Sequence, residues 1–343
     1  MTRTMTRHKL LYGVILLFAL GACQTRSSYK TAGTIERLDP ALDEIVDPTA
    51  AVEIISEGHN WSEGPLWLES QHKLIFSDVP ENTIFQWSED KGTEPYLKPS
   101  GWTGPDSLLR EGSNGLLLDP SGKLVLSQHG DRRMARMTAS LDTPAPTYET
   151  IADRYDGKRF NSPNDAAYYG TDLFFTDPPW GLPQYANDPM REVPFMGVYR
   201  VSAGGQVDLL IDSLTSPNGI ALSPDGQSLY VANSDPQKAR WYRYQVNRPD
   251  GDSGKMSLSN GKIIYDASTL TSSEKGLPDG MKINKQGIIF GTGPGGLFIF
   301  SPDGKLLGKV KLTEATSNCA LSADEKTLYI TNDMYILRIK LKS

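Results

Sequence analysis

The chain has 343 residues, and 35 Lys and Arg face 41 Asp and Glu, for a formal net charge of −6 at pH 7. This acidic balance argues against nucleic-acid binding, and we expect no nucleic-acid partner. The 32 Gly and 23 Pro residues suit many tight turns, and no window has the pattern of a long amphipathic helix. We therefore expect a nearly all-β protein.

The N-terminus predicts a targeting segment. Basic residues between Arg3 and Lys9 precede the apolar run Leu10–Leu20, which is too short to span a bilayer comfortably. The run ends in Leu20-Gly21-Ala22-Cys23, which resembles the bacterial lipobox. The resemblance implies a signal peptide over residues 1–22, cleavage before Cys23, and lipidation of Cys23. An ordinary signal peptide with a coincidental cysteine is the alternative.

Residues 23–49 are polar, carry few aromatics, and are predicted to form a tether. Gln24, directly after Cys23, gives no inner-membrane retention signal. We therefore expect a bacterial cell-envelope protein that faces the periplasm, preferably at the outer membrane, and that contacts the membrane only through a lipid anchor on Cys23. We expect residues 50–343 to form one domain and the protein to be a monomer.

From residue 50 onward the chain repeats one pattern six times. A polar residue precedes a short apolar run, a Gly/Asp/Ser turn follows, and then comes a strand that ends in a small or polar residue. The six leading residues are Glu63, Asn114, Asn164, Asn218, Asp279 and Asn318. Repeats of roughly 40 to 60 residues made of short strands indicate a β-propeller, here six-bladed with four-stranded blades.

The sixth repeat lacks a fourth strand because the chain ends at Ser343. A matching strand lies at the other end of the domain, at Val52–Ser56. We predict that this N-terminal strand completes the last blade and closes the ring, which removes the free sheet edges of a linear array.

The leading polar residues predict a cation site. In a propeller the start of each innermost strand faces the central channel, so six oxygen-bearing side chains would converge on one axis. Hard oxygen ligands suit Ca²⁺, with Mg²⁺, Mn²⁺ or Zn²⁺ as substitutes. The alternative is that these side chains only bond to strand ends and bind nothing.

Four short motifs resemble the calcium-dependent lactonase propellers, the family of gluconolactonase and regucalcin, which is related to diisopropyl fluorophosphatase. These motifs are Glu63-Gly64-Pro65, Pro163-Asn164-Asp165, Ser216-Pro217-Asn218-Gly219 and Pro278-Asp279-Gly280-Met281. The resemblance covers about residues 50 to 343. It implies Ca²⁺ held by Glu63, Asn164, Asn218 and Asp279, and lactone hydrolysis in which Asp279 is the base or the nucleophile.

Four further residues are predicted to contact substrate. Asn114 matches a substrate-binding position, although Gly112 stands where regucalcin-like members carry an arginine. His129 and Trp180 belong to segments that resemble the bacterial and fungal gluconolactonase branch. Asn318 stands where the fluorophosphatase branch carries a histidine. For His129 the alternative is a bond to the next blade, and for Trp180 it is packing on the rim.

Three functions remain open from sequence. The first is a calcium-dependent carboxylic-ester hydrolase that acts on a small-molecule lactone. The second is a related phosphotriesterase or arylesterase. The third is a non-catalytic envelope propeller that binds a sugar or a protein, with Ca²⁺ as a structural plug. Cys319 is expected to be a small buried residue at the start of a strand. The alternative is a thiol nucleophile, against which no histidine lies close in sequence and the repeat already explains the position.

Overall fold

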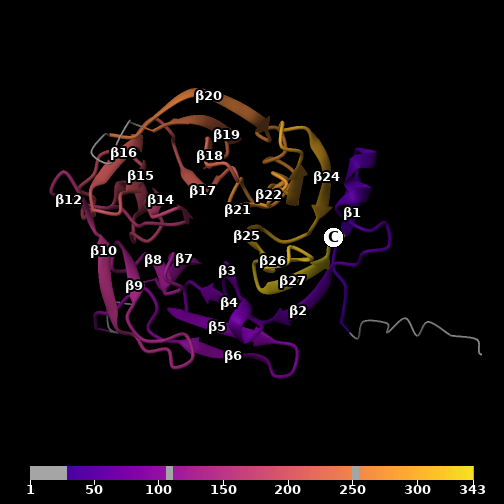
Figure 1. Cartoon of the computed structure of the whole chain (residues 1–343), viewed down its shortest axis with the longest axis horizontal. Coiled ribbons are helices and arrows are strands. Elements are labelled where there is room, and N and C mark those ends of the chain that lie inside the picture. The colour runs from indigo at the N-terminus through magenta and orange to yellow at the C-terminus, as the bar shows by residue number, and fades with distance from the viewer. Residues whose placement is uncertain (1–28, 106–110, 249–254, 343) are drawn as a thin grey trace, which may run out of the picture.

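The computed structural model describes residues 29–105, 111–248 and 255–342. Six antiparallel sheets stand around a central axis, and the chain visits them in order around the ring (Figure 1). The predicted six-bladed β-propeller is therefore confirmed. The expected signal peptide over residues 1–22 and the lipidation site Cys23 lie outside the described residues. Among the described residues, no helix is long and apolar enough to cross a bilayer.

The first three blades have four strands each, and the innermost strand comes first in sequence. Blade 1 comprises β3 (Ser62–Leu68), β4 (Lys73–Asp78), β5 (Thr83–Ser88) and β6 (Gly92–Leu97). Blade 2 comprises β7 (Ser113–Leu118), β8 (Leu124–Gln128), β9 (Arg133–Met137) and β10 (Tyr148–Ala152). Blade 3 comprises β13 (Ala166–Tyr169), β14 (Asp172–Asp177), β15 (Gly197–Val201) and β16 (Val207–Ile211).

The last three blades follow the same plan, with additions at both ends of the chain. Blade 4 comprises β17 (Pro217–Leu222), β18 (Ser228–Asp235), β19 (Lys238–Asn247) and β20 (Ser257–Asp266). Blade 5 comprises β21 (Met281–Ile283), β22 (Ile289–Gly293), β23 (Gly296–Phe300) and β24 (Leu306–Lys311). Blade 6 comprises β25 (Thr316–Leu321), β26 (Thr327–Asn332), β27 (Tyr335–Lys340) and the N-terminal β2 (Glu53–Glu57).

The pairing of β2 with β27 confirms the predicted closure of the ring, with Glu53 opposite Arg338 and Glu57 opposite Tyr335. Short elements decorate the loops. They are the hairpin β11 (Arg154–Tyr155) and β12 (Lys158–Arg159), and the 3-10 turns η1 (Pro40–Glu44), η2 (Glu69–Gln71) and η4 (Tyr185–Asn187).

The core is divided among the gaps between neighbouring blades. Each of the six interfaces holds its own cluster of buried apolar side chains. The second strands lie in the middle of this packing, and every residue of β8, β22 and β26 is buried. Both faces of each blade are therefore covered by neighbouring blades. This is why the second strands contain continuous rather than alternating apolar residues.

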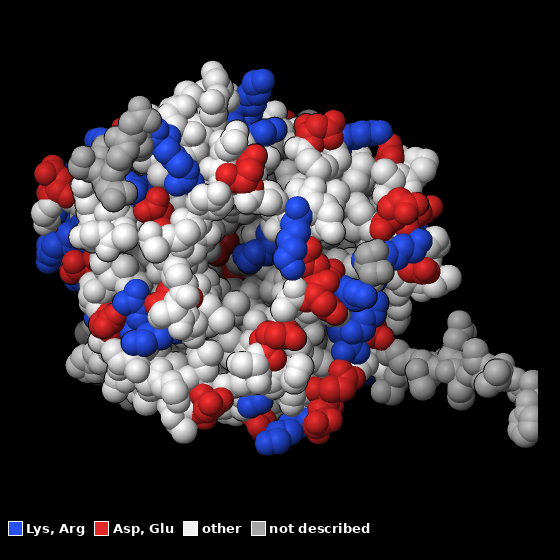
Figure 2. Space-filling model, viewed as in Figure 1, with Lys and Arg blue, Asp and Glu red and all other residues white. Residues whose placement is uncertain are grey.

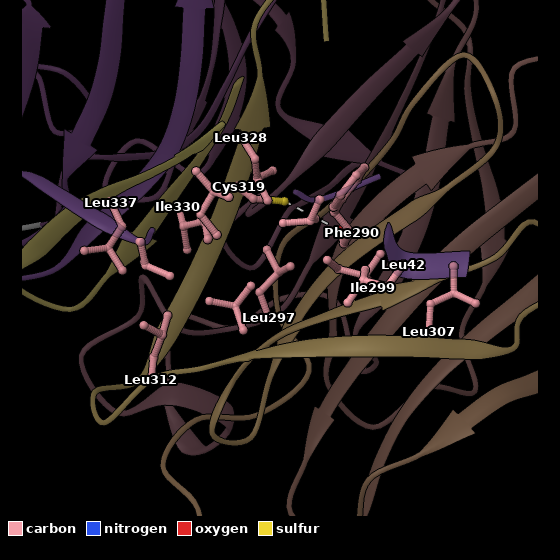
Figure 3. Packing of buried hydrophobic residues seen from close by; sticks show 14 residues of the cluster. Leu42, Phe290, Leu297, Ile299, Leu307, Leu312, Cys319, Leu328, Ile330 and Leu337 are labelled. Carbon is pink, nitrogen blue, oxygen red and sulfur yellow. Dashed lines mark hydrogen bonds between the residues drawn. The ribbon is translucent and has the colours of Figure 1, made fainter. Parts of the chain in front are cut away.

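The segment before the propeller differs from the expected tether. Strand β1 (Thr34–Arg37) pairs with β24 and makes blade 5 five-stranded. Leu42 and Val46 are fully buried in the cluster between blades 5 and 6, where Figure 3 shows Leu42 beside Ile299. Burying a leucine contributes about 2 kcal/mol. From residue 29 this segment is therefore part of the propeller body, because two apolar side chains inside a polar stretch dock it.

Five polar side chains form a second repeated feature, which we call the strand-end polar residues. They lie at or near the ends of the second strands, and they are Asp78, Gln128, Asp177, Asn233 and Asn332. Each bonds to backbone of the segment that leads into an innermost strand. Asp177 accepts from the backbone amides of Asn161 and Ser162, both at 2.8 Å. Asn233 accepts from Ser216 at 2.9 Å and donates to the carbonyl of Lys238 at 2.9 Å. These side chains thus satisfy buried loop backbone.

Candidate metal and substrate site in the central channel

A cavity of about 600 Å³ opens at one end of the central channel. Seven of the eight predicted site residues line it, namely Glu63, Asn114, His129, Asn164, Trp180, Asn218 and Asp279. Trp61, Val79 and Leu277 add apolar wall. The eighth, Asn318, does not line this cavity and instead donates its amide to Glu63 Oε2 at 3.2 Å. The structure therefore places the predicted set in one region of the molecule.

β-Bulges help turn the leading residues of several blades toward the axis. The pairing register of the innermost strand shifts between Glu63 and Leu66 in blade 1 and between Pro217 and Ile220 in blade 4. Similar shifts occur in blades 2 and 6. A bulge adds a residue to one strand and re-aims the side chains around it. Asn114 and Asn218 fall inside these shifts and are not paired, whereas Glu63 and Asn318 border the shifts and are paired with the second strand.

Glycines allow the blades to meet closely at the axis. A Cβ atom at Gly64 would lie 2.1 Å from the carbonyl oxygen of Asn114, and one at Gly219 would lie 2.1 Å from that of Asp279. Gly115 and Gly280 make equivalent close approaches to the next blade. A side chain at these positions would push the blades apart, so the recurring glycine after the leading residue is a steric requirement.

We call seven residues around the channel the axial polar residues: Glu63, Asn114, Asn164, Asp165, Asn218, Asp279 and Asn318. All are buried except Asp279, which is partly exposed as a residue although its Oδ1 atom is buried. Asp165 directly follows Asn164 and was not predicted as a site residue, although it stands in the quoted Pro163-Asn164-Asp165 motif. It adds a third carboxyl group to those of Glu63 and Asp279.

The carboxyl groups are held in an unfavourable electrostatic environment. Burial raises the pKa of Glu63 to about 7. Burial also raises the pKa of Asp279 well above its usual value, and repulsion from Glu63 and Asp165 adds to the rise. Three buried oxygens of the axial polar residues have no hydrogen-bond partner, namely Asn114 Oδ1, Asp165 Oδ2 and Asp279 Oδ1. Such groups are costly in a folded protein, and a cation would relieve both the repulsion and the missing bonds.

The donor set fits a hard cation that accepts amide as well as carboxylate oxygens. Among the described residues, no three His, Cys, Asp or Glu side chains converge closely enough to hold a metal by themselves. The predicted ligands are instead two carboxylates, Glu63 and Asp279, and two amides, Asn164 and Asn218. Oxygen ligands of this mixture are typical of Ca²⁺ rather than of a thiolate or imidazole zinc site.

His129 lies between the predicted ligand Asn164 and the carboxyl group of Glu111, which is not among the predicted site residues. Its Nε2 is 3.0 Å from Asn164 Oδ1, and its Nδ1 is 3.0 Å from Glu111 Oε2. The ring is buried, whereas 40% of the Glu111 side chain is exposed at the cavity. His129 therefore bonds to the neighbouring blade, as its alternative interpretation expected, and also borders the cavity.

The insertion after β14 brings Trp180 to the cavity wall. Arg132 anchors the insertion, since its guanidinium donates to the carbonyls of Phe160 at 2.7 Å and Met190 at 2.9 Å. Gly181 lies against His129, and a Cβ there would be 2.7 Å from His129 Cβ. The loop thus covers one side of the site and packs against the Cβ atom of His129.

A basic side chain lies on the opposite side of the axial polar residues. The Lys282 ammonium donates to the carbonyl of Met281 at 3.1 Å and to Asn318 Oδ1 at 3.3 Å. It also lines a second cavity of about 310 Å³. In Figure 2 the face of the ring toward the viewer is hollowed at its centre, with charged side chains inside the hollow. Lys282 places positive charge near the carboxyl groups, and the sequence alone did not suggest that role.

Comparison with known proteins agrees with this geometry. Residues 61–333 match a family profile described as the SMP-30/Gluconolactonase/LRE-like region. A gluconolactonase from Zymomonas mobilis is 36% identical over 328 residues, which cover 94% of this chain and 90% of the relative. The solved structure of a gluconolactonase from Xanthomonas campestris superposes with a TM-score of 0.75 and 26% identity, over 93% of this chain and 99% of that one. A solved regucalcin from Agrobacterium tumefaciens, with a TM-score of 0.63 and 16% identity, covers 84% of this chain and 94% of its own, and shares the fold.

Proposed function

Because the chain belongs to the SMP-30/gluconolactonase/LRE-like family, we propose that it is a calcium-dependent hydrolase that opens the ring of a small lactone. One observation carries the proposal: buried oxygens of Asn114, Asp165 and Asp279 have no partner and lie among three carboxyl groups on the propeller axis. A purely structural channel would have no reason to keep them unsatisfied.

Glu63, Asn164, Asn218 and Asp279 are the residues that would hold the ion. When bound, Ca²⁺ supplies a Lewis acid that polarises the lactone carbonyl. The cavity of about 600 Å³ accommodates a small molecule, and its apolar residues Val79 and Leu277 suit the carbon face of a ring.

Asp279 is the proposed catalytic residue. Asp279 lines the cavity and is partly exposed as a residue, so its carboxyl group can reach a substrate bound there, whereas its buried Oδ1, which has no hydrogen-bond partner, is the oxygen left for the ion. As a general base it would take a proton from the attacking water, and as a nucleophile it would attack the carbonyl carbon directly. Asn114, His129 and Trp180 border the same cavity and would orient the substrate.

The test is hydrolysis of gluconolactone by the full chain, followed in a pH-stat with added Ca²⁺, with chelator, and in Asp279→Ala. We expect turnover that disappears on chelation and in the variant. The matched control is Asp142→Ala, which removes an exposed carboxylate that accepts a hydrogen bond from Gln71 and does not line the cavity. Retained activity in Asp279→Ala would remove the catalytic assignment.

Absence of turnover, with Ca²⁺ still raising the melting temperature, would leave a cation site without lactonase activity. Assays of aryl esters and phosphotriesters would then separate the related hydrolases from a binding protein.

We also propose lipidation at Cys23 and outer-membrane attachment. Cys23→Ser should move the protein from the membrane fraction to the soluble fraction, and an unchanged distribution would contradict the anchor.

A further inference from the structure

A chain of hydrogen bonds runs partway around the axis, from blade 2 to the start of blade 5. Its members are, in order, Glu111, His129, Asn164, Asn218, Ser234 and the carbonyl of Pro278. The first two hydrogen bonds, Glu111–His129 and His129–Asn164, are both 3.0 Å long. The next two hydrogen bonds are 2.6 Å between Asn164 and Asn218 and 2.9 Å between Asn218 and Ser234. The Ser234 hydroxyl completes the chain by donating to the Pro278 carbonyl.

The chemistry of the last member fixes the direction of every bond before it. A carbonyl oxygen can only accept, so the Ser234 hydroxyl donates its proton to Pro278. Ser234 Oγ then accepts from the Asn218 amide nitrogen, and Asn218 Oδ1 accepts from the Asn164 amide nitrogen. Asn164 Oδ1 in turn accepts from His129, which must therefore carry a proton on Nε2.

This direction determines which side of each amide is oxygen. Asn164 Oδ1 and Asn218 Oδ1 each accept one bond within the chain, and each keeps a second lone pair, because an amide oxygen has two. If either amide rotated by half a turn, an NH₂ group would replace that oxygen and repel a cation. The chain therefore selects the amide orientation that a cation requires.

Both ends of the chain are held by other contacts. Ser234 is buried, with 8% of its surface exposed, beside the segment that carries Asp279. At the other end, Gly181 approaches the Cβ and backbone of His129 closely, so the base of this side chain is packed. Glu111 Oε2 lies 3.0 Å from His129 Nδ1 and so contacts the ring from the cavity side.

We propose that Glu111 and Ser234 are positioning residues that hold the amide oxygens of Asn164 and Asn218 in the orientation that binds the cation. The inference rests on the proposed function, because it specifies how the same site is prepared for its ion. Neither residue touches the cation in this proposal. Each acts through the amide next to it in the chain, as outer partners of metal ligands do.

The test at the blade 4 end is calorimetric titration of the full chain with CaCl₂ in the absence of substrate. Ser234→Ala removes the hydroxyl and should weaken calcium binding about 10-fold, the lower end of effects for such outer partners. Ser234→Thr retains the hydroxyl and should bind within about twofold of the wild type. Melting temperatures without Ca²⁺ check that both variants fold.

At the blade 2 end, Glu111→Ala should also weaken calcium binding about 10-fold. Glu111→Gln can still bond to His129 Nδ1 and should stay within about twofold of the wild type. Adding Glu111→Ala to a His129→Ala background should cause no further loss, because Glu111 acts through His129. The matched control is Glu149→Ala, which removes a carboxylate that pairs with Arg136 on the same blade but away from the cavity.

Activity at saturating Ca²⁺ separates positioning from substrate contact. Turnover in Glu111→Ala and Ser234→Ala should recover toward the wild-type rate when Ca²⁺ is saturating, because only ion affinity is impaired. Unchanged affinity in either alanine variant overturns the proposal for that end of the chain. Absence of calcium binding by the wild type would instead overturn the calcium site of the proposed function, so the two failures are distinguishable.

Discussion

The axial polar residues and the strand-end polar residues are both inside the propeller, but only the strand-end set is fully used by the fold. The side chains of Asn233 and Asp177 form hydrogen bonds with loop backbone groups. In contrast, Asn114, Asp165 and Asp279 each keep a buried oxygen without a partner. Both sets repeat from blade to blade, so repetition alone does not separate structure from function. Hydrogen-bond satisfaction separates these two sets, because buried oxygens without a partner occur among the axial polar residues and in none of the strand-end polar residues.

The largest expected effect breaks the axial set at Asp279. Asp279→Asn should lower lactone turnover by about 1,000-fold, because the side chain can no longer act as base or nucleophile. In the metal-free protein the same change should raise the melting temperature, since it removes one of three mutually repelling carboxyl groups. Steady-state kinetics and thermal unfolding measure the two effects. A lower melting temperature would mean that Asp279 supports the fold as the strand-end residues do.

The second prediction compares the same substitution in the two sets. Asn233→Ala should lower the free energy of unfolding by about 2 kcal/mol, because it removes two hydrogen bonds to the loop backbone, one from the Ser216 amide and one to the Lys238 carbonyl. Asn114→Ala should change it by less than about 1 kcal/mol, since Asn114 Oδ1 has no bond to lose. Urea unfolding at one pH provides both values. Equal losses in the two variants would contradict the distinction between the sets.

The third prediction concerns pH. Burial raises the pKa of Glu63 from 4.5 to about 7, so the folded state binds a proton that the unfolded state has released between those values. The contribution of Glu63 to stability is therefore greatest below pH 4.5 and is lost as the pH rises through 7. Glu63→Gln should stabilise the metal-free protein by about 2 kcal/mol more at pH 8 than at pH 5.

Saturating Ca²⁺ should remove that difference, because a bound cation favours the ionised carboxylate. The measurement is urea unfolding of both proteins at the two pH values, with and without Ca²⁺. A wild type whose metal-free stability rises from pH 5 to pH 8 relative to Glu63→Gln would show that the carboxylate is already satisfied in the fold.

The smallest expected effect lies one residue from the axis. Cys319 follows Asn318 but points into the cluster between blades 5 and 6, beside Phe290 (Figure 3). Burial raises the pKa of its thiol to about 12, so at pH 8 it should not react with iodoacetamide until the protein unfolds. Cys319→Ala should cost about 1 kcal/mol and leave turnover unchanged. Labelling of the native thiol, mapped by mass spectrometry, would show that it is accessible.

The sequence by itself determined the blade count, the ring closure by β2, and the residues that face the axis. These features follow from the local pattern, in which a polar residue, often followed by a glycine, precedes a strand and a turn in each repeat. In a propeller, the same place in every repeat lies at the same distance from the central axis. Four of the leading residues also match motifs of the family. Asp165 could have been predicted as a site residue from the sequence, because it lies inside one of those motifs.

Tertiary structure alone decided the contacts between repeats. The docking of β1 and Leu42 depends on the edge of β24 and on the apolar cluster between blades 5 and 6. Likewise, Glu111, His129 and Asn164 are joined across blades, and Lys282 reaches Asn318 from a neighbouring strand. No spacing rule relates residues so far apart in sequence. The distances between these side chains are set by how neighbouring blades pack in the closed ring. The periodic pattern therefore predicts the oxygens around the axis but not the side chains that orient them.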